Sequence, residues 1–276
     1  MTHRQILDAA VQKLSAAGIT EAHNDAFMLW QEAFGLNRTG YLINADKEAD
    51  SDLSPKFLML VNLRCTRMPL QYITGKAYFM GLEFKVTPDV LIPRFDTEIL
   101  VEEALKHVNE DSEVLDVCTG SGCIGISLSV LGKCSVTAVD ISESALEIAK
   151  ANADSNKANK INFVHSDMFQ NITGQYDLIV SNPPYIPSQD VLELMPEVLE
   201  HEPKLALDGH EDGLFFYRIL AENSSKFLKS GGMLIMEIGY NQAEDVYALL
   251  EKNNYTDIRV IKDLAGHYRV VCGRRK

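Results

Sequence analysis

The feature that most constrains this chain is an alternation of strand-like and helix-like segments that begins at residue 113. Such alternation is typical of a doubly wound α/β domain, because each helix carries the chain back to the edge where the next parallel strand starts. We therefore predict an α/β fold with a mostly parallel, seven-stranded sheet. Apolar runs rich in β-branched residues predict its strands at 113–118, 135–140, 162–164, 176–180, 233–238, 258–261 and 268–272.

The first seventy residues carry a helical pattern instead. Apolar residues recur at helical spacing in 6–14, 27–34 and 53–63, and Gly18 and Gly35 are suited to end the first two helices. No group of chemically reactive side chains stands out in this part. We predict a small helical bundle that serves as an adaptor or a lid.

Residues 71–95 differ in composition from both neighbours. Aromatic and β-branched residues, punctuated by Gly75 and Gly81, predict a β-hairpin linker here. The expected organisation is therefore a helical domain at 1–70, the linker at 71–95 and the α/β domain at 96–276.

Charge is distributed unevenly along the 276 residues. The net charge is −13, and residues 1–84 account for only −1 of it. A strongly acidic surface repels phosphate backbones, so no direct binding of nucleic acid is expected. No apolar run has the length of a membrane span, and the first residues lack the apolar stretch of a signal peptide, so we expect a cytoplasmic protein without membrane contact.

Cysteine and histidine give no indication of a metal site. The five cysteines are scattered without a zinc-binding spacing, and the seven histidines form no ligand pair. We expect no metal.

A glycine-rich segment, Gly120-x-Gly122-x-x-Gly125, stands between the first predicted strand of the α/β domain and the helix that follows. An acid, Asp140, ends the next strand, 20 residues after Gly120. This arrangement is typical of a nucleoside cofactor site in which a carboxylate accepts hydrogen bonds from the ribose hydroxyls. The alternative is that the glycines serve only a tight turn and that Asp140 caps the helix starting at Ser142.

Other side chains at strand ends suit the same cofactor. Asp116 lies inside a predicted strand, so its buried carboxylate needs donors, either backbone N–H groups of the glycine loop or the amino end of a bound ligand. Asp167 can accept from the exocyclic amine of adenine or cap a helix. Met168 and Phe169 either hold a purine ring between them or belong to the core.

The stretch Asn182-Pro183-Pro184-Tyr185 directly follows the fourth strand of this domain. Two consecutive prolines end strand pairing and stiffen the turn, and they add carbonyl acceptors to the Asn182 amide. Such a pocket suits a planar NH2 group, although Asn-Pro also starts ordinary turns. A nicotinamide cofactor would leave Asn182 without a role. S-adenosyl-L-methionine at the glycine loop, with a methyl-accepting NH2 group at Asn182, explains both the loop and the turn.

These motifs resemble those of class I S-adenosylmethionine-dependent methyltransferases, which have a Rossmann-like fold. More narrowly, the chain resembles the PrmC/HemK family, the protein-(glutamine-N5) methyltransferases of peptide chain release factors. The Asn-Pro-Pro-Tyr motif is shared with adenine-N6 enzymes, and the more specific likeness lies in the segments 92–98 (IPRFDTE) and 202–209 (EPKLALDG). His201, Tyr268 and Met168 depart from the family's usual residues.

The resemblance implies a methyl transfer to the glutamine of the Gly-Gly-Gln loop of class-1 release factors, with S-adenosyl-L-homocysteine as product. Asn182 and the Pro183 carbonyl would accept the two amide hydrogens, Tyr185 would pack on the amide plane, and Pro184 and Arg94 would complete the substrate site. Because a Gly-Gly-Gln loop offers little surface for recognition, we further expect the helical domain to dock the release factor, and we expect the enzyme to be a monomer. The donor contacts implied are Cys118, Thr119, Gly120, Ser121, Gly122, Asp140, Ile141, Asp167, Met168, Phe169 and Asn182.

Two alternative functions remain open from the sequence. One is an adenine-N6 or guanine-N2 methyltransferase of nucleic acids, which predicts a basic face that this sequence does not show. The other is a non-catalytic S-adenosylmethionine-binding adaptor, which would be expected to lose Asn182 or Tyr185, and both are present.

Overall fold

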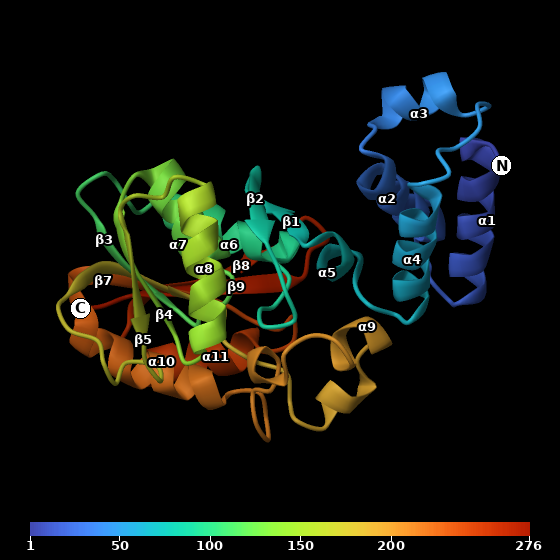
Figure 1. Ribbon diagram of the computed structural model, residues 1–276. Coiled ribbons are helices and arrows are strands. Elements are labelled where there is room, and N and C mark those ends of the chain that lie inside the picture. The colour runs from blue at the N-terminus through green and yellow to red at the C-terminus, as the bar shows by residue number, and fades with distance from the viewer. The chain divides into compact units, whose positions relative to one another are not determined.

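The computed structural model describes all residues from 1 to 276, and the chain forms two compact units (Figure 1). Unit 1 comprises Met1–Gly75 together with Met195–His201, and unit 2 comprises Lys76–Leu194 together with Glu202–Lys276. None of the helices is both long enough and apolar enough to cross a membrane.

Unit 1 is helical, which confirms the predicted N-terminal helical region. Its core is built around Trp30, which is fully buried and donates from its indole N–H to His3 Nδ1 over 3.2 Å. The aromatic rings of Phe27, Phe34 and Tyr41 surround Trp30. The helices are α1 (His3–Ala16), α2 (Ala22–Phe34), α3 (Arg38–Asn44), α4 (Ser54–Cys65), α5 (Leu70–Thr74) and α9 (Pro196–Leu199).

The short helix α9 belongs to unit 1 although it lies late in the sequence. Glu197 forms ion pairs with Arg64 (3.2 Å) and Arg67 (2.6 Å), and Arg64 also pairs with Asp25 (2.8 Å). Arg64 is 7% exposed, so its charge is compensated by two carboxylates in a buried setting. This cluster fixes residues 195–201 to the helical unit.

Unit 2 contains the predicted seven-stranded, mostly parallel sheet. The strand order is β5-β4-β3-β6-β7-β9-β8, in which only β9 runs antiparallel to its neighbours β7 and β8. The strands are β3 (Glu113–Val117), β4 (Ser135–Asp140), β5 (Ile161–His165), β6 (Tyr176–Ser181), β7 (Leu228–Glu237), β8 (Thr256–Lys262) and β9 (Tyr268–Arg274). Their order reverses between β3 and β6, the place where open α/β sheets bind ligands.

Helices cover both faces of this sheet. Successive side chains of a strand point to opposite faces, so each buried strand packs against both helical layers. Val114 and Leu178 pack against α6, α7 and α8, whereas Leu115 and Ile179 pack against α10 and α11. Figure 1 shows the two helical layers on either side of the strands. The helices are α6 (Phe95–Leu105), α7 (Cys123–Ser127), which continues as the π-helical turn η1 (Leu128–Gly132), α8 (Glu143–Ser155), α10 (Phe215–Phe227) and α11 (Ala243–Lys252).

The predicted β-hairpin is shorter than expected. It consists of β1 (Lys76–Phe79) and β2 (Leu82–Lys85), while 71–74 lie in helix α5. Pro69 accounts for this difference, since its carbonyl accepts from the N–H groups of Tyr72 and Ile73 and so starts a helical turn. Gly75 then ends the turn with a φ of +72°.

Candidate active site

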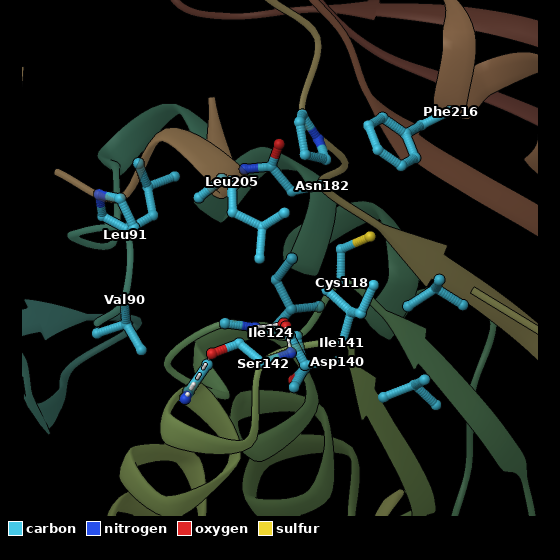
Figure 2. A pocket seen from close by; sticks show the side chains of 18 of the residues that line it. Val90, Leu91, Cys118, Ile124, Asp140, Ile141, Ser142, Asn182, Leu205 and Phe216 are labelled. Atoms are coloured by element: carbon cyan, nitrogen blue, oxygen red, sulfur yellow. Dashed lines mark hydrogen bonds between the residues drawn. The ribbon is translucent and has the colours of Figure 1, made fainter. Parts of the chain in front are cut away.

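A cavity of about 460 Å³ lies at the carboxyl ends of the parallel strands of unit 2. Residues that follow β3, β4, β5 and β6 form one wall, and the segments 88–94 and 203–216 form two further walls (Figure 2). This volume suits a ligand of nucleoside size together with a small acceptor group.

The first glycine of the motif faces this cavity. Gly120 has a φ of +55°, and no atom lies within 4 Å of the position that a Cβ would take there. Asp140 holds the loop from the neighbouring strand, because its carboxylate accepts from the N–H groups of Gly120 (2.8 Å) and Ser142 (2.9 Å). Asp140 therefore both braces the loop and lines the cavity, while Ser142 itself caps α8 by accepting from Ala145 N–H.

The third glycine is required for close packing. A Cβ on Gly125 would lie 2.8 Å from the Asp116 carboxylate, to which the Gly125 N–H donates over 2.9 Å. The Thr119 hydroxyl donates to the same oxygen over 2.6 Å. The predicted backbone donor to Asp116 is thus present, whereas its Oδ1 is buried without a partner. Burial raises the pKa of Asp116 to about 7.

The predicted site residues divide into two groups by position. Cavity-lining members are Arg94, Cys118, Thr119, Gly120, Asp140, Ile141, Asp167, Met168, Asn182 and Pro184. The remaining five, which do not line the cavity, are Ser121, Gly122, Phe169, Pro183 and Tyr185. Some residues of the second group pack behind those that line the cavity.

Phe169 and Gly122 belong to the packing rather than to the wall. The Phe169 ring stacks on Phe227 with centroids 5.1 Å apart and does not line the cavity, whereas Met168 does. A Cβ on Gly122 would lie 2.7 Å from Ile126 Cδ1, and the φ of +82° there also favours glycine.

Three non-glycine residues in the cavity wall have left-handed backbone conformations, and one of them is His210 with a φ of +67°. Cys118 has a φ of +63° and Met168 a φ of +47°, and their sulfur atoms lie 3.8 Å apart. Such conformations cost about 1–3 kcal/mol each and persist where surrounding structure enforces them. Cys118 directly follows β3 and Met168 lies three residues beyond β5, so the wall is strained at both of these strand ends.

Asn182 stands where β6 enters the cavity (Figure 2). Its Nδ2 donates to the Thr97 hydroxyl on α6 over 3.3 Å. Because this bond uses the amide nitrogen, the amide oxygen is the group left to accept from a ligand.

The turn after Asn182 is held by the segment 207–213. Gly209 N–H donates to Ile186 O (2.8 Å), and Ile186 N–H donates to Leu207 O (3.1 Å). A Cβ on Gly213 would lie 2.4 Å from Tyr185 O, so only glycine allows this approach. The sequence around 202–209 is thus needed to support the Asn-Pro-Pro-Tyr turn.

Tyr185 supports the site from outside the cavity. Its hydroxyl donates to Glu237 Oε1 over 3.4 Å, and burial raises the pKa of the phenol well above its usual value. Tyr185 does not line the cavity in this structure, and its packing on a substrate amide stays a prediction.

Arg94 joins the two segments that carry the specific resemblance. Its guanidinium forms an ion pair with Glu202, whose side chain is 1% exposed. Burial raises the pKa of Glu202, and the charge of Arg94 opposes this shift. The pair fastens the wall at 88–94 to the wall at 203–216.

Several residues of the wall were not predicted. The apolar run at 90–92 lies between Pro88 and Pro93 and could have been recognised as an extended wall segment. Phe215 and Phe216 line the cavity from the start of α10, where helical periodicity cannot separate them from core residues. Unpredicted wall residues also include Val90 and Leu91 of that run, and Thr97, Ile124, Leu205 and His210.

The sheet order, the glycine loop beside Asp140 and the acceptor turn at Asn182 together define a methyltransferase of the class I type. A family model described as Methyltransferase small domain matches residues 94–210, and one described as PrmC N-terminal domain matches 5–75. A methyltransferase structure from Pyrococcus furiosus shares the fold, with a TM-score of 0.55 at 19% identity over 71% of this chain and 90% of that one.

The relatives specify the family. A release factor glutamine methyltransferase of Geobacter sulfurreducens is 41% identical over 99% of this chain and 96% of its own length. Another of the same name from Fusobacterium nucleatum is 38% identical over 98% of this chain and 78% of its own length. The chain belongs to the family of release factor glutamine methyltransferases, and it is an enzyme, which confirms the predicted resemblance.

Proposed function

We propose that the protein transfers the methyl group of S-adenosyl-L-methionine to the side-chain amide nitrogen (N5) of the glutamine in the Gly-Gly-Gln loop of class-1 peptide chain release factors, and so modulates translation termination. The observation that carries this proposal is that one cavity is lined both by the Asp140-braced glycine loop and by the Asn182 amide. S-adenosyl-L-homocysteine is the expected product.

The residues present fit the donor. Gly120 leaves open space in the wall, and the Asp140 carboxylate in that wall is suited to accept from ribose hydroxyls. Asp167 is available to accept from an adenine amine, and Met168 offers an apolar contact for the ring. The bound donor supplies an electrophilic methyl group.

The acceptor side of the cavity positions a weak nucleophile. An amide nitrogen has a delocalised lone pair, so orientation and polarisation must carry most of the catalysis. The oxygen of Asn182, which lines the cavity, is proposed to accept one hydrogen of the glutamine NH2 group. The carbonyl of Pro183, the next residue of the turn, is proposed to accept the other, although Pro183 itself does not line the cavity. After transfer, the nitrogen loses one of these protons.

We propose that unit 1 provides the docking surface for the release factor. All cavity-lining residues belong to unit 2, so unit 1 has no part in the cavity itself. Unit 1 also exposes large apolar side chains, among them Leu42 (70%), Ile43 (66%) and Met59 (54%). Recognition of a folded protein needs roughly 800 Å² per partner, more than a short loop supplies.

The test uses the full-length protein with methyl-labelled donor and a purified class-1 release factor. We expect one methyl group on the Gly-Gly-Gln glutamine, located by mass spectrometry, and none on a release factor in which this glutamine is replaced by glutamate. A peptide containing Gly-Gly-Gln should be a poorer substrate than the intact factor if docking contributes. Label on DNA or RNA without label on the release factor would favour the nucleic-acid alternative.

A further inference from the structure

Glu237 is a buried carboxylate behind the acceptor turn. It is the last residue of β7 and is 2% exposed. Met236, the residue before Glu237 on β7, pairs with Ser181, the last residue of β6. Glu237 therefore lies beside the end of β6, which Asn182 directly follows. Its Oε1 accepts from the Tyr185 hydroxyl, while its Oε2 has no partner.

Thr97 connects this carboxylate to Asn182. The Thr97 side chain lies near enough to Glu237 to favour the ionised carboxylate, and its Oγ1 lies 3.3 Å from Asn182 Nδ2. The buried Oε2 of Glu237 lacks a partner and needs a donor, which the Thr97 hydroxyl is suited to supply. A hydroxyl carries a single hydrogen, so a hydroxyl that donates to a carboxylate can only accept from its other neighbour. The Asn182 amide must then turn its nitrogen toward Thr97 and leave its oxygen for the substrate.

We propose that Thr97 and Glu237 are positioning residues for methyl transfer, which act by fixing the orientation of the Asn182 amide. This proposal rests on the proposed function. A reversed amide would present an NH2 group to the NH2 group of the substrate, and neither could accept. The chain from Asn182 through Thr97 to Glu237 also polarises each bond in turn, which makes the Asn182 oxygen a stronger acceptor.

The ionised form of Glu237 is the form that enforces this orientation. A carboxylate only accepts, whereas a protonated carboxyl group can donate to Thr97 and release its hydroxyl to point at Asn182. Burial raises the pKa of Glu237 to about 7; Thr97, Arg269 and Tyr185 favour the ionised form, and Asp96 opposes it. Because the active form is the deprotonated one, kcat should rise with pH through about 7.

The test compares Thr97→Val with Thr97→Ser in the full-length protein. Valine keeps the shape and removes the hydroxyl, so we expect kcat on release factor to fall roughly 30-fold, with donor Kd and release factor KM within about threefold. Serine restores the hydroxyl and should recover most of kcat. Ser127→Ala, which removes a buried hydroxyl that has no partner, is the matched control and should leave kcat unchanged.

The pH profile provides an independent arm. Glu237→Gln cannot ionise, so the rise of kcat near pH 7 should disappear, provided that thermal unfolding and donor binding match the wild type. The proposal is overturned if folded Thr97→Val keeps wild-type kcat, if Thr97→Ser does not rescue, or if Glu237→Gln keeps the wild-type pH profile. A wild-type protein that leaves release factor unmethylated would instead refute the proposed function, and the positioning role with it.

Discussion

At the glycine-loop end of the cavity, the main chain is the chief support. Asp140 accepts from two backbone N–H groups and Asp116 from a third, all within residues 116–142. At the Asn182 end, the support comes from distant segments, through backbone bonds of Leu207 and Gly209 to Ile186 and through several side chains. Thr97 holds the amide, Gln242 donates to Tyr185 O over 2.9 Å, and Glu237 accepts from the Tyr185 hydroxyl.

This difference assigns different tasks to the two ends. Backbone donors on a short loop can hold a rigid binding surface for a donor molecule, whose affinity then depends on local contacts. Side chains gathered from several elements can orient one functional group, whose effect appears when the reacting atoms meet. Substitutions at the first end should therefore change binding of the donor, and substitutions at the second end should change turnover.

The largest expected effect lies at the second end. Asn182→Ala should lower kcat by more than a hundredfold, because loss of an acceptor used in the transition state costs about 3 kcal/mol or more. Donor affinity, measured by titration calorimetry, should stay within a few-fold of wild type. The comparison between the two ends fails if this variant turns over at the wild-type rate or if its main defect is in donor binding.

The difference between the two ends of the cavity also explains which parts of the fold and site could be predicted from the sequence. The strand and helix alternation, the glycine loop and Asp140 follow from short-range patterns, and the structure contains each of them. The contacts of Thr97 with Asn182 and of Arg94 with Glu202 join residues 85 and 108 positions apart, which no local pattern encodes. The resemblance pointed to these segments without giving the physical reason for them.

Side chains that occur both in cores and in sites were also hard to assign. Phe169 and Phe216 both follow ordinary apolar patterns, yet Phe169 stacks in the core and Phe216 lines the cavity. Tyr185 belongs to a motif that suggests substrate contact, but its hydroxyl is used by Glu237. Periodicity reports burial, and burial is common to both positions.

The second prediction concerns the glycine-loop end. Asp140→Ala removes the acceptor for the N–H groups of Gly120 and Ser142 and for the donor's ribose, so donor binding should weaken by roughly 2–3 kcal/mol. At saturating donor, kcat should stay within a few-fold of wild type. Calorimetric titration with S-adenosyl-L-methionine provides the measurement.

Asp177→Ala is the matched control for this variant. Asp177 also accepts from a backbone N–H, that of Glu113, but it lies at the opposite, amino-terminal end of β6. Its loss should leave donor affinity unchanged. If both variants weaken binding equally, general loosening of the sheet, and not the site, would account for the effect of Asp140.

The smallest expected effect belongs to the ion pair that fastens the two cavity walls. Arg94→Ala leaves the buried Glu202 without its cation, so the segment 203–216 should lose its fixed position against 88–94. Because Arg94 is itself 39% exposed, we expect only a roughly tenfold rise in KM for release factor, about 1.4 kcal/mol, with donor affinity unchanged.

A double-mutant cycle separates the ion pair from direct substrate contact. If the pair fastens the walls, adding Glu202→Gln to Arg94→Ala should cause little further loss, because the uncompensated buried charge is removed. If Arg94 binds the release factor directly, the two losses should add. Arg274→Ala, which removes a similarly exposed arginine paired with Asp257, should leave KM unchanged and so controls for the loss of one surface charge.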